Sequence, residues 1–203
     1  DEVKAYVKEL ARSYDTAYRK HAFTTAEGKD ITIDSGFYGW RMNRSEETEE
    51  LINLIKQGAV VEKEPVYIQT AASHGERDYG DTYVEINLSK QHLYFWEKGN
   101  IIIESDFVSG NMVKGMATPG GIFPITYKER NAVLKGTNYR TPVSYWMPFN
   151  GGIGMHDAPW RKQFGGTIYE TNGSHGCINL PVDVAREIYE HVAAGMPVIC
   201  YYE

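Results

Sequence analysis

The chain has 203 residues, of which 42% are hydrophobic and 13% aromatic, and this apolar content excludes an intrinsically disordered protein. At roughly 150 residues per domain, the length allows one large domain, or a small domain together with a medium one. The net charge is −6 and the basic residues do not cluster, so we expect no nucleic-acid partner, and no apolar run approaches the ~18 residues of a membrane span.

The N-terminal part of the chain predicts a small α/β unit. Apolar residues recur at helical spacing in the first 20 or so residues, which predicts one amphipathic helix. A second helix is predicted over residues 45–57, with Ser45 as its N-cap and Gly58 as its end. Between the two helices, the alternating segment Asp30–Asp34 predicts a short strand.

A polar, glycine-containing stretch at residues 71–81 predicts a linker. We therefore divide the chain into a small α/β domain, residues 1–78, and a second domain, residues 79–203. In the second domain, segments typical of strands replace the helical spacing, and one late helix, Pro181–Ala194, is predicted. The predicted fold class is α+β, with a mostly β domain after the small α/β domain. The clearest strands are predicted over residues 83–88, 92–97, 101–108 and 197–202.

The two cysteines, Cys177 and Cys200, are too few for a disulfide scaffold or for a zinc site of four thiolates. Cys200 lies in an apolar strand, which is typical of a packing role. Cys177 lies instead in the motif Gly-Ser-His-Gly-Cys-Ile-Asn. Because a free thiol has a pKa of about 8.5, a cysteine that transfers acyl groups needs a nearby base or cation. His175 and His156 are both candidates, and the pattern alone does not choose between them.

This motif resembles the active-site signature of the L,D-transpeptidases, the YkuD-type cysteine enzymes of peptidoglycan cross-linking. Their signature is a histidine, a spacer of 14 to 17 residues, Ser/Thr-His-Gly-Cys, a hydrophobic residue, and Asn or Arg. Here His156 is followed by 17 residues and then by Ser174 to Asn179, so every position is filled. The similarity extends over residues 82–203. Residues 1–78 resemble the peptidoglycan-binding domain that precedes the catalytic domain in many Gram-positive members.

The resemblance implies a role for each residue of the motif. Cys177 would be the nucleophile and His156 the general base, with the imidazole oriented by the main-chain carbonyl of Asp157. The main-chain N–H groups of His175, Gly176 and Cys177 would form the oxyanion hole.

The resemblance also implies a set of residues around the substrate. Ser174 and Asn179 would hold the catalytic turn by hydrogen bonding. The aromatic residues Tyr145, Trp146 and Trp160 flank His156 in sequence and are expected to contact substrate. No cofactor and no metal are expected.

The fold that the resemblance implies is a YkuD-like β-sandwich, and the reaction is the cross-linking of peptidoglycan stem peptides. Cys177 would attack a tetrapeptide stem, release D-alanine and pass the acyl group to an amine of another stem, which forms a 3→3 cross-link. Carbapenem β-lactams would acylate the same thiol. Because the chain begins at Asp1, we expect a processed or shortened product whose export signal or anchor lies upstream. Its expected location is the cell wall or the outer face of the membrane.

Several alternatives remain open at this point. The same thioester could pass to water, which would make the protein an L,D-carboxypeptidase. The protein could instead be a non-catalytic wall-binding protein that keeps the fold. Cys177 and Cys200 could form a disulfide. His156, His175 and Cys177 could also provide three ligands to zinc. The oligomeric state is left open.

Overall fold

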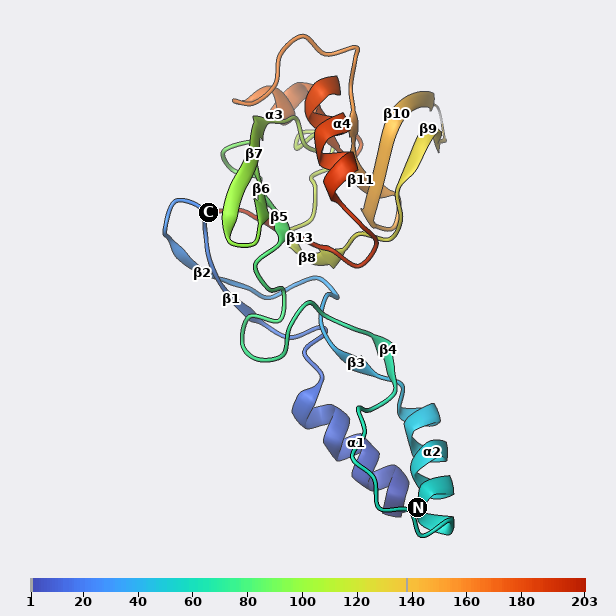
Figure 1. Ribbon diagram of the computed structural model, residues 1–203. Helices are drawn as coiled ribbons and strands as arrows, with labels where there is room; N and C mark the ends of the chain where they lie inside the picture. The colour runs from blue at the N-terminus through green and yellow to red at the C-terminus, as the bar shows by residue number, and fades with distance from the viewer. Residues whose placement is uncertain (1, 138) are drawn as a thin grey trace.

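The computed structural model describes residues 2–137 and 139–203. This part of the chain contains four helices and thirteen strands (Figure 1). The helices are α1 (Glu2–Tyr14), α2 (Arg44–Lys56), α3 (Ile168–Asn172) and α4 (Val182–His191). The strands are β1 (His21–Thr24), β2 (Asp30–Ile33), β3 (Arg41–Met42), β4 (Tyr67–Gln69), β5 (Tyr83–Asn87), β6 (His92–Glu97), β7 (Asn100–Asp106), β8 (Gly121–Pro124), β9 (Glu129–Gly136), β10 (Tyr139–Asn150), β11 (Ile153–Asp157), β12 (Ile178–Leu180) and β13 (Pro197–Tyr201). No helix in these ranges is long and apolar enough to cross a membrane.

Helices α1 and α2 lie side by side at the end of the molecule remote from α3 and α4 (Figure 1). The apolar face of α1 buries Val7 against Met42 of β3, as the helical spacing predicts. Helix α2 begins one residue earlier than predicted, and the prediction of Ser45 as its N-cap is wrong. Asn43 is the cap, because its side chain accepts a hydrogen bond from the amide of Glu46, and Ser45 falls inside the first turn.

The hairpin of β1 and β2 packs away from these helices, against the later part of the chain. Phe23 of β1 is buried with Tyr83 of β5 and Tyr201 of β13, and its ring centroid lies 5.8 Å from both of theirs. Residues on both sides of position 78 therefore share one apolar cluster. The domain boundary at residue 78 stays a prediction.

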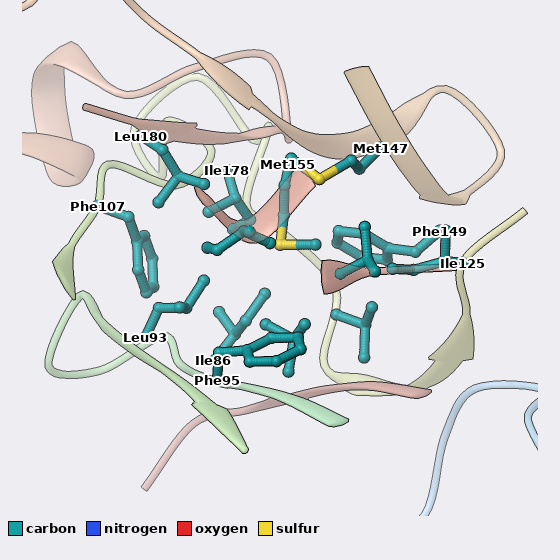
Figure 2. Packing of buried hydrophobic residues seen from close by; sticks show 14 of the residues in the cluster. Ile86, Leu93, Phe95, Phe107, Ile125, Met147, Phe149, Met155, Ile178 and Leu180 are labelled. Atoms are coloured by element: carbon teal, nitrogen blue, oxygen red, sulfur yellow. The ribbon is translucent and has the colours of Figure 1, made fainter. Parts of the chain in front are cut away.

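Two sheets stack on each other in the second half of the chain. One sheet has the strand order β7-β6-β5-β13-β8, and the other has the order β12-β11-β10-β9. Figure 2 shows the core between them, where Leu93 and Phe95 of the first sheet face Met155 and Ile178 of the second. All four side chains are fully buried. The fold is therefore the predicted mostly β sandwich of an α+β protein.

Helix α4 covers one side of this sandwich and packs on β10 and β11. It follows Pro181 and buries Ala185 and Ile188, which confirms the predicted late helix, although it ends at His191. The prediction of a single helix in this half is wrong, because α3 is also present. Its five residues give too few turns for a helical period to be visible in the sequence.

Candidate active site

Parallel pairing of β11 with β12 joins the two segments of the signature. The register places His156 opposite Asn179, and β10 lies on the other side of β11 with Trp146 opposite His156. The turn that carries Cys177 comes immediately before β12. A cavity of about 450 Å³ opens at this point, and its lining includes Cys177, His156 and His175. The fold therefore brings the thiol and both candidate bases to one cavity.

The Cys177 thiol is half-buried and lies against the apolar cluster of Trp146. Its Sγ lies 3.6 Å from the carbonyl oxygen of Gly152, to which it donates a hydrogen bond. Burial raises the pKa of this thiol to about 11, while a hydrogen bond from the backbone of Gly154 acts in the opposite direction. Cys177 is therefore a neutral thiol at neutral pH, and it needs a base to take its proton as it attacks.

The His156 imidazole has the properties of such a base. Its side chain is buried, and Nδ1 lies 2.8 Å from the carbonyl oxygen of Asp157. A carbonyl can only accept a hydrogen bond, so Nδ1 carries the proton and Nε2 keeps its lone pair. Burial lowers the pKa of His156, the bond to Asp157 raises it, and the charge of Arg161 lowers it, with a net shift downward. The imidazole is therefore neutral and can accept a proton at neutral pH.

The side chain of Asp157 braces this arrangement rather than facing the cavity. Its Oδ1 accepts hydrogen bonds from the backbone amides of Ser144 at 2.8 Å and Tyr145 at 2.9 Å. These bonds tie the end of β11 to β10, with the carboxylate buried. The Asp157 carbonyl is thereby held in place beside the His156 ring.

The catalytic turn is held by two hydroxyl groups. Ser174 Oγ donates to the carbonyl of Cys177 at 2.5 Å and accepts from the amide of Gly176 at 3.0 Å. Thr118, from the turn before β8, donates to the carbonyl of Gly176 at 2.6 Å. An amide has one proton, so the bond to Ser174 already engages the N–H of Gly176. This bond makes the Gly176 amide less suited to the predicted oxyanion hole than the amides of His175 and Cys177, and the oxyanion hole itself stays a prediction.

Gly176 has a backbone conformation that side chains rarely adopt, with φ at +123°, and an added Cβ would lie 3.2 Å from Ile153. We expect Gly176→Ala to lower the free energy of unfolding by about 1–3 kcal/mol and to reduce turnover, because the strained turn displaces the thiol and its amide. Denaturant titration measures the first effect and a rate assay the second. Gly152→Ala is the matched stability control, because its φ is outside the left-handed region and a Cβ there meets nothing within 4 Å. Equal stability losses in both variants would contradict the prediction.

The three predicted aromatic contacts occupy three different environments. Trp160 is 50% exposed and lines the cavity, with its ring centroid 6.0 Å from that of His156. Trp146 is buried in the apolar cluster against which Cys177 packs, and its ring centroid lies 5.9 Å from that of His156. Tyr145 packs instead on Tyr189 of α4, at 5.5 Å between ring centroids. Neighbours on a strand point to opposite faces, so we withdraw Tyr145 as a substrate contact.

The cavity contains residues that the sequence analysis missed. Tyr139, at the start of β10, stacks on the His175 ring with 4.6 Å between centroids, and no motif marks it in the sequence. Arg161 also lines the cavity. It lies directly after Trp160, in the spacer between the two parts of the signature, and this position could have identified it from the sequence. The predicted residues Ser174 and Asn179 lie in the same lining.

Both cysteines are free thiols, so the alternative of a Cys177–Cys200 disulfide is not realised. Across residues 2–137 and 139–203, no group of three His, Cys, Asp or Glu side chains is arranged to hold a metal ion. Asn179 has a buried Oδ1 that finds no hydrogen-bond partner in the same ranges. Asn179 is itself among the residues that line the cavity.

Comparison with known families assigns descriptions to both parts of the chain. Residues 81–200 match the family model of the L,D-transpeptidase catalytic domain, YkuD. Residues 1–61 match the model described as "Putative peptidoglycan binding domain". Together these matches imply a location related to the cell wall.

Solved structures and a curated protein are also similar to this chain. A crystal structure of an Enterococcus faecium L,D-transpeptidase mutant is 35% identical, with a TM-score of 0.81 over 98% of this chain and 81% of that one. The NMR structure of an E. faecium L,D-transpeptidase catalytic domain acylated by ertapenem is 42% identical, with a TM-score of 0.55 over 60% of this chain and 98% of that one. A Bacillus subtilis protein named "Putative L,D-transpeptidase YciB" is 29% identical over an alignment of 118 residues that covers 54% of this chain and 60% of that protein. The chain thus matches less than two thirds of that curated relative.

Proposed function

The chain belongs to the L,D-transpeptidase catalytic-domain family, and on that premise we propose that it cross-links peptidoglycan stems through a thioester on Cys177. The observation that carries the proposal is the shared cavity of Cys177 and His156, in which Asp157 fixes the imidazole with its Nε2 lone pair available. A nucleophile, a base and a group that orients the base are the parts that cysteine acyl transfer requires.

The first half-reaction forms the acyl-enzyme. His156 Nε2 takes the thiol proton while Sγ attacks the carbonyl carbon between the third stem residue and the terminal D-alanine. The amides of His175 and Cys177 stabilise the negative charge that develops on the carbonyl oxygen. The C–N bond then breaks, His156 gives its proton to the departing amine, and D-alanine leaves.

The second half-reaction transfers the acyl group to an amine. The amine on the third residue of another stem attacks the thioester carbon, and His156 takes a proton from the attacking nitrogen. The C–S bond breaks, and the sulfur regains that proton. The product is a 3→3 cross-link, and no ATP is required because the thioester retains the energy of the cleaved amide.

The pKa values of the two groups support this proton path. Burial raises the pKa of Cys177 to about 11 and lowers that of His156, so both groups are neutral at rest. A resting thiolate–imidazolium pair is disfavoured in such a site, and proton transfer accompanies the attack on the substrate. The thiol and the imidazole therefore stay uncharged until a substrate is bound.

The proposed partners are peptidoglycan stem peptides and β-lactams of the carbapenem class, and the proposed location is the outer face of the cell. The match of residues 1–61 to a peptidoglycan-binding family supports the first partner and the location. The E. faecium catalytic domain acylated by ertapenem supports the second.

Product analysis tests transfer against hydrolysis. With a tetrapeptide donor and an acceptor stem that carries a free side-chain amine, we expect cross-linked dimers and one free D-alanine for each dimer formed. Chromatography with mass spectrometry measures both products, and the donor incubated without acceptor amine is the control. Free tripeptide without dimers would assign the protein to the L,D-carboxypeptidases instead. Intact donor in both incubations would contradict the enzymatic proposal.

A further inference from the structure

The lining of the catalytic cavity has a charge opposite to that of the protein as a whole. The chain has 27 Asp and Glu residues against 21 Lys and Arg, but among the described residues no Asp or Glu lines this cavity. Its ionisable groups are the Arg161 guanidinium, two imidazoles, the Tyr139 phenol and the Cys177 thiol. The cavity therefore offers a positive charge that no lining carboxylate neutralises, and it is suited to an anionic group.

Arg161 is fixed in place by a bond at one end of its guanidinium. Nη1 donates to the carbonyl oxygen of Asn172, the last residue of α3, at 2.9 Å. The side chain is half-buried, and burial lowers its pKa, although a guanidinium remains protonated at neutral pH. None of the ion pairs found among the described residues involves Arg161.

The opposite end of the same guanidinium carries an unused donor. Arg161 Nε is buried and has no hydrogen-bond partner among the described residues. A buried donor without a partner is rare in folded proteins because it loses its bonds to water without replacing them. Nε and Nη2 together form a planar edge with two parallel N–H groups, which matches the two oxygens of a carboxylate. With Nη1 bound to Asn172, this edge is the one left for a ligand.

We propose that Arg161 binds a carboxylate of the donor stem peptide and thereby selects an anionic substrate. The inference rests on the proposed function, which supplies the peptide. Two carboxylates of a stem peptide could bind this edge in the same way. One is the C-terminal carboxylate of the departing D-alanine, and the other is the side-chain carboxylate of a diaminopimelate at the third position. Arg161 follows Trp160 directly, so the cation and an exposed aromatic surface lie together beside His156.

Peptide binding to Cys177→Ala protein tests the proposal without turnover. The probes are a tetrapeptide with a free C-terminal carboxylate and the same peptide as its C-terminal amide, each made with lysine or with diaminopimelate at the third position. We expect Arg161→Gln to weaken binding of at least one carboxylate-bearing probe by about 10-fold or more, as charged hydrogen bonds typically require. Arg161→Lys keeps the charge but loses the planar edge, so its loss should be intermediate.

The four probes distinguish the two carboxylates. If the C-terminal carboxylate is bound, Arg161→Gln weakens both free-acid peptides and leaves both amides unchanged. If the side-chain carboxylate is bound, Arg161→Gln weakens the binding of both diaminopimelate peptides and leaves the binding of both lysine peptides unchanged. Lys162→Gln is the matched control, because Lys162 is the neighbouring cation on the same segment, is exposed and is not part of the cavity lining.

Comparing the affinities of the four probes for Arg161→Gln protein also distinguishes a carboxylate-binding role of Arg161 from a purely structural one. If Arg161 only anchors α3 through Asn172, Arg161→Gln will change the affinity of all four probes by the same factor, and the proposal is overturned. Unchanged affinities for all probes would overturn it as well. Failure of the proposed function looks different: wild-type protein would form no dimers, while the Cys177→Ala protein would still bind carboxylate probes in a manner that depends on Arg161.

Discussion

Cys177→Ala is expected to reduce acyl transfer to background, a loss on the order of 10⁶-fold for removal of an enzyme nucleophile. The reason is that alanine offers no atom to hold the acyl group, whatever the rest of the cavity does. The same variant should show no mass increase with a carbapenem, whereas wild-type protein should gain one adduct. Initial rates of dimer formation and intact-mass measurement check the two outcomes.

The fold should tolerate this change. Cys177 is half-buried at the cavity wall, so loss of its sulfur leaves no enclosed void, and we expect the free energy of unfolding to change by about 1 kcal/mol or less. Cys200→Ala is the matched control, because Cys200 is fully buried in β13 and has no place in the proposed chemistry. It should lose stability and keep its carbapenem adduct. Turnover by Cys177→Ala at a rate near that of wild type would refute the assignment of the nucleophile.

His156→Gln is expected to lower kcat/KM about 10²- to 10⁴-fold, the usual contribution of a positioned general base. In wild-type protein, activity should fall with acid as His156 becomes protonated. Because burial lowers its pKa, this acid limb should lie below the ~6.5 of an unperturbed histidine. The pH profile of kcat/KM with a saturating acceptor measures both effects.

His175→Gln separates the two candidate bases. The His175 side chain is exposed and stacks on Tyr139, and its proposed contribution to the reaction is a main-chain amide that glutamine also has. We expect this variant to keep the wild-type acid limb and most of its activity. Loss of the acid limb in His175→Gln but not in His156→Gln would transfer the role of base to His175.

The sequence predicted best those helices and strands for which the spacing of apolar residues alone determines the type of element. The amphipathic helix α1 and strands β5 and β6 follow from apolar spacing. The N-cap of α2 was assigned wrongly because Asn43 and Ser45 are both good caps, and only the backbone geometry selects one.

For the candidate site, the signature located the residues but not their contacts. It placed Cys177 and His156 in one motif, yet the parallel pairing of β11 with β12 that joins them depends on tertiary structure. The bond between Gly176 and Ser174 depends on side-chain geometry that a sequence does not show. Alternation along a strand, by contrast, could have separated Tyr145 from Trp146 once a strand was assumed there.

Residues that reach the cavity from distant segments had weak signals or none. Tyr139 lies 36 residues before His175 and meets it only because β10 runs beside β11. Thr118 reaches the catalytic turn only through the fold, which brings its hydroxyl to the Gly176 carbonyl. Arg161 differs from these two residues, because it lies directly after Trp160 inside the signature spacer, and that position is its signal in the sequence.

The most direct measurement is to locate the acyl group on the protein during turnover. Wild-type protein is mixed with a tetrapeptide donor without acceptor, quenched in acid, digested and mapped by mass spectrometry. Our account predicts that the peptide containing residue 177 gains the donor's acyl portion without its D-alanine, and that hydroxylamine removes this group from the sulfur. Cross-linked product formed without any acyl group on Cys177, or with that group on another residue, would contradict it.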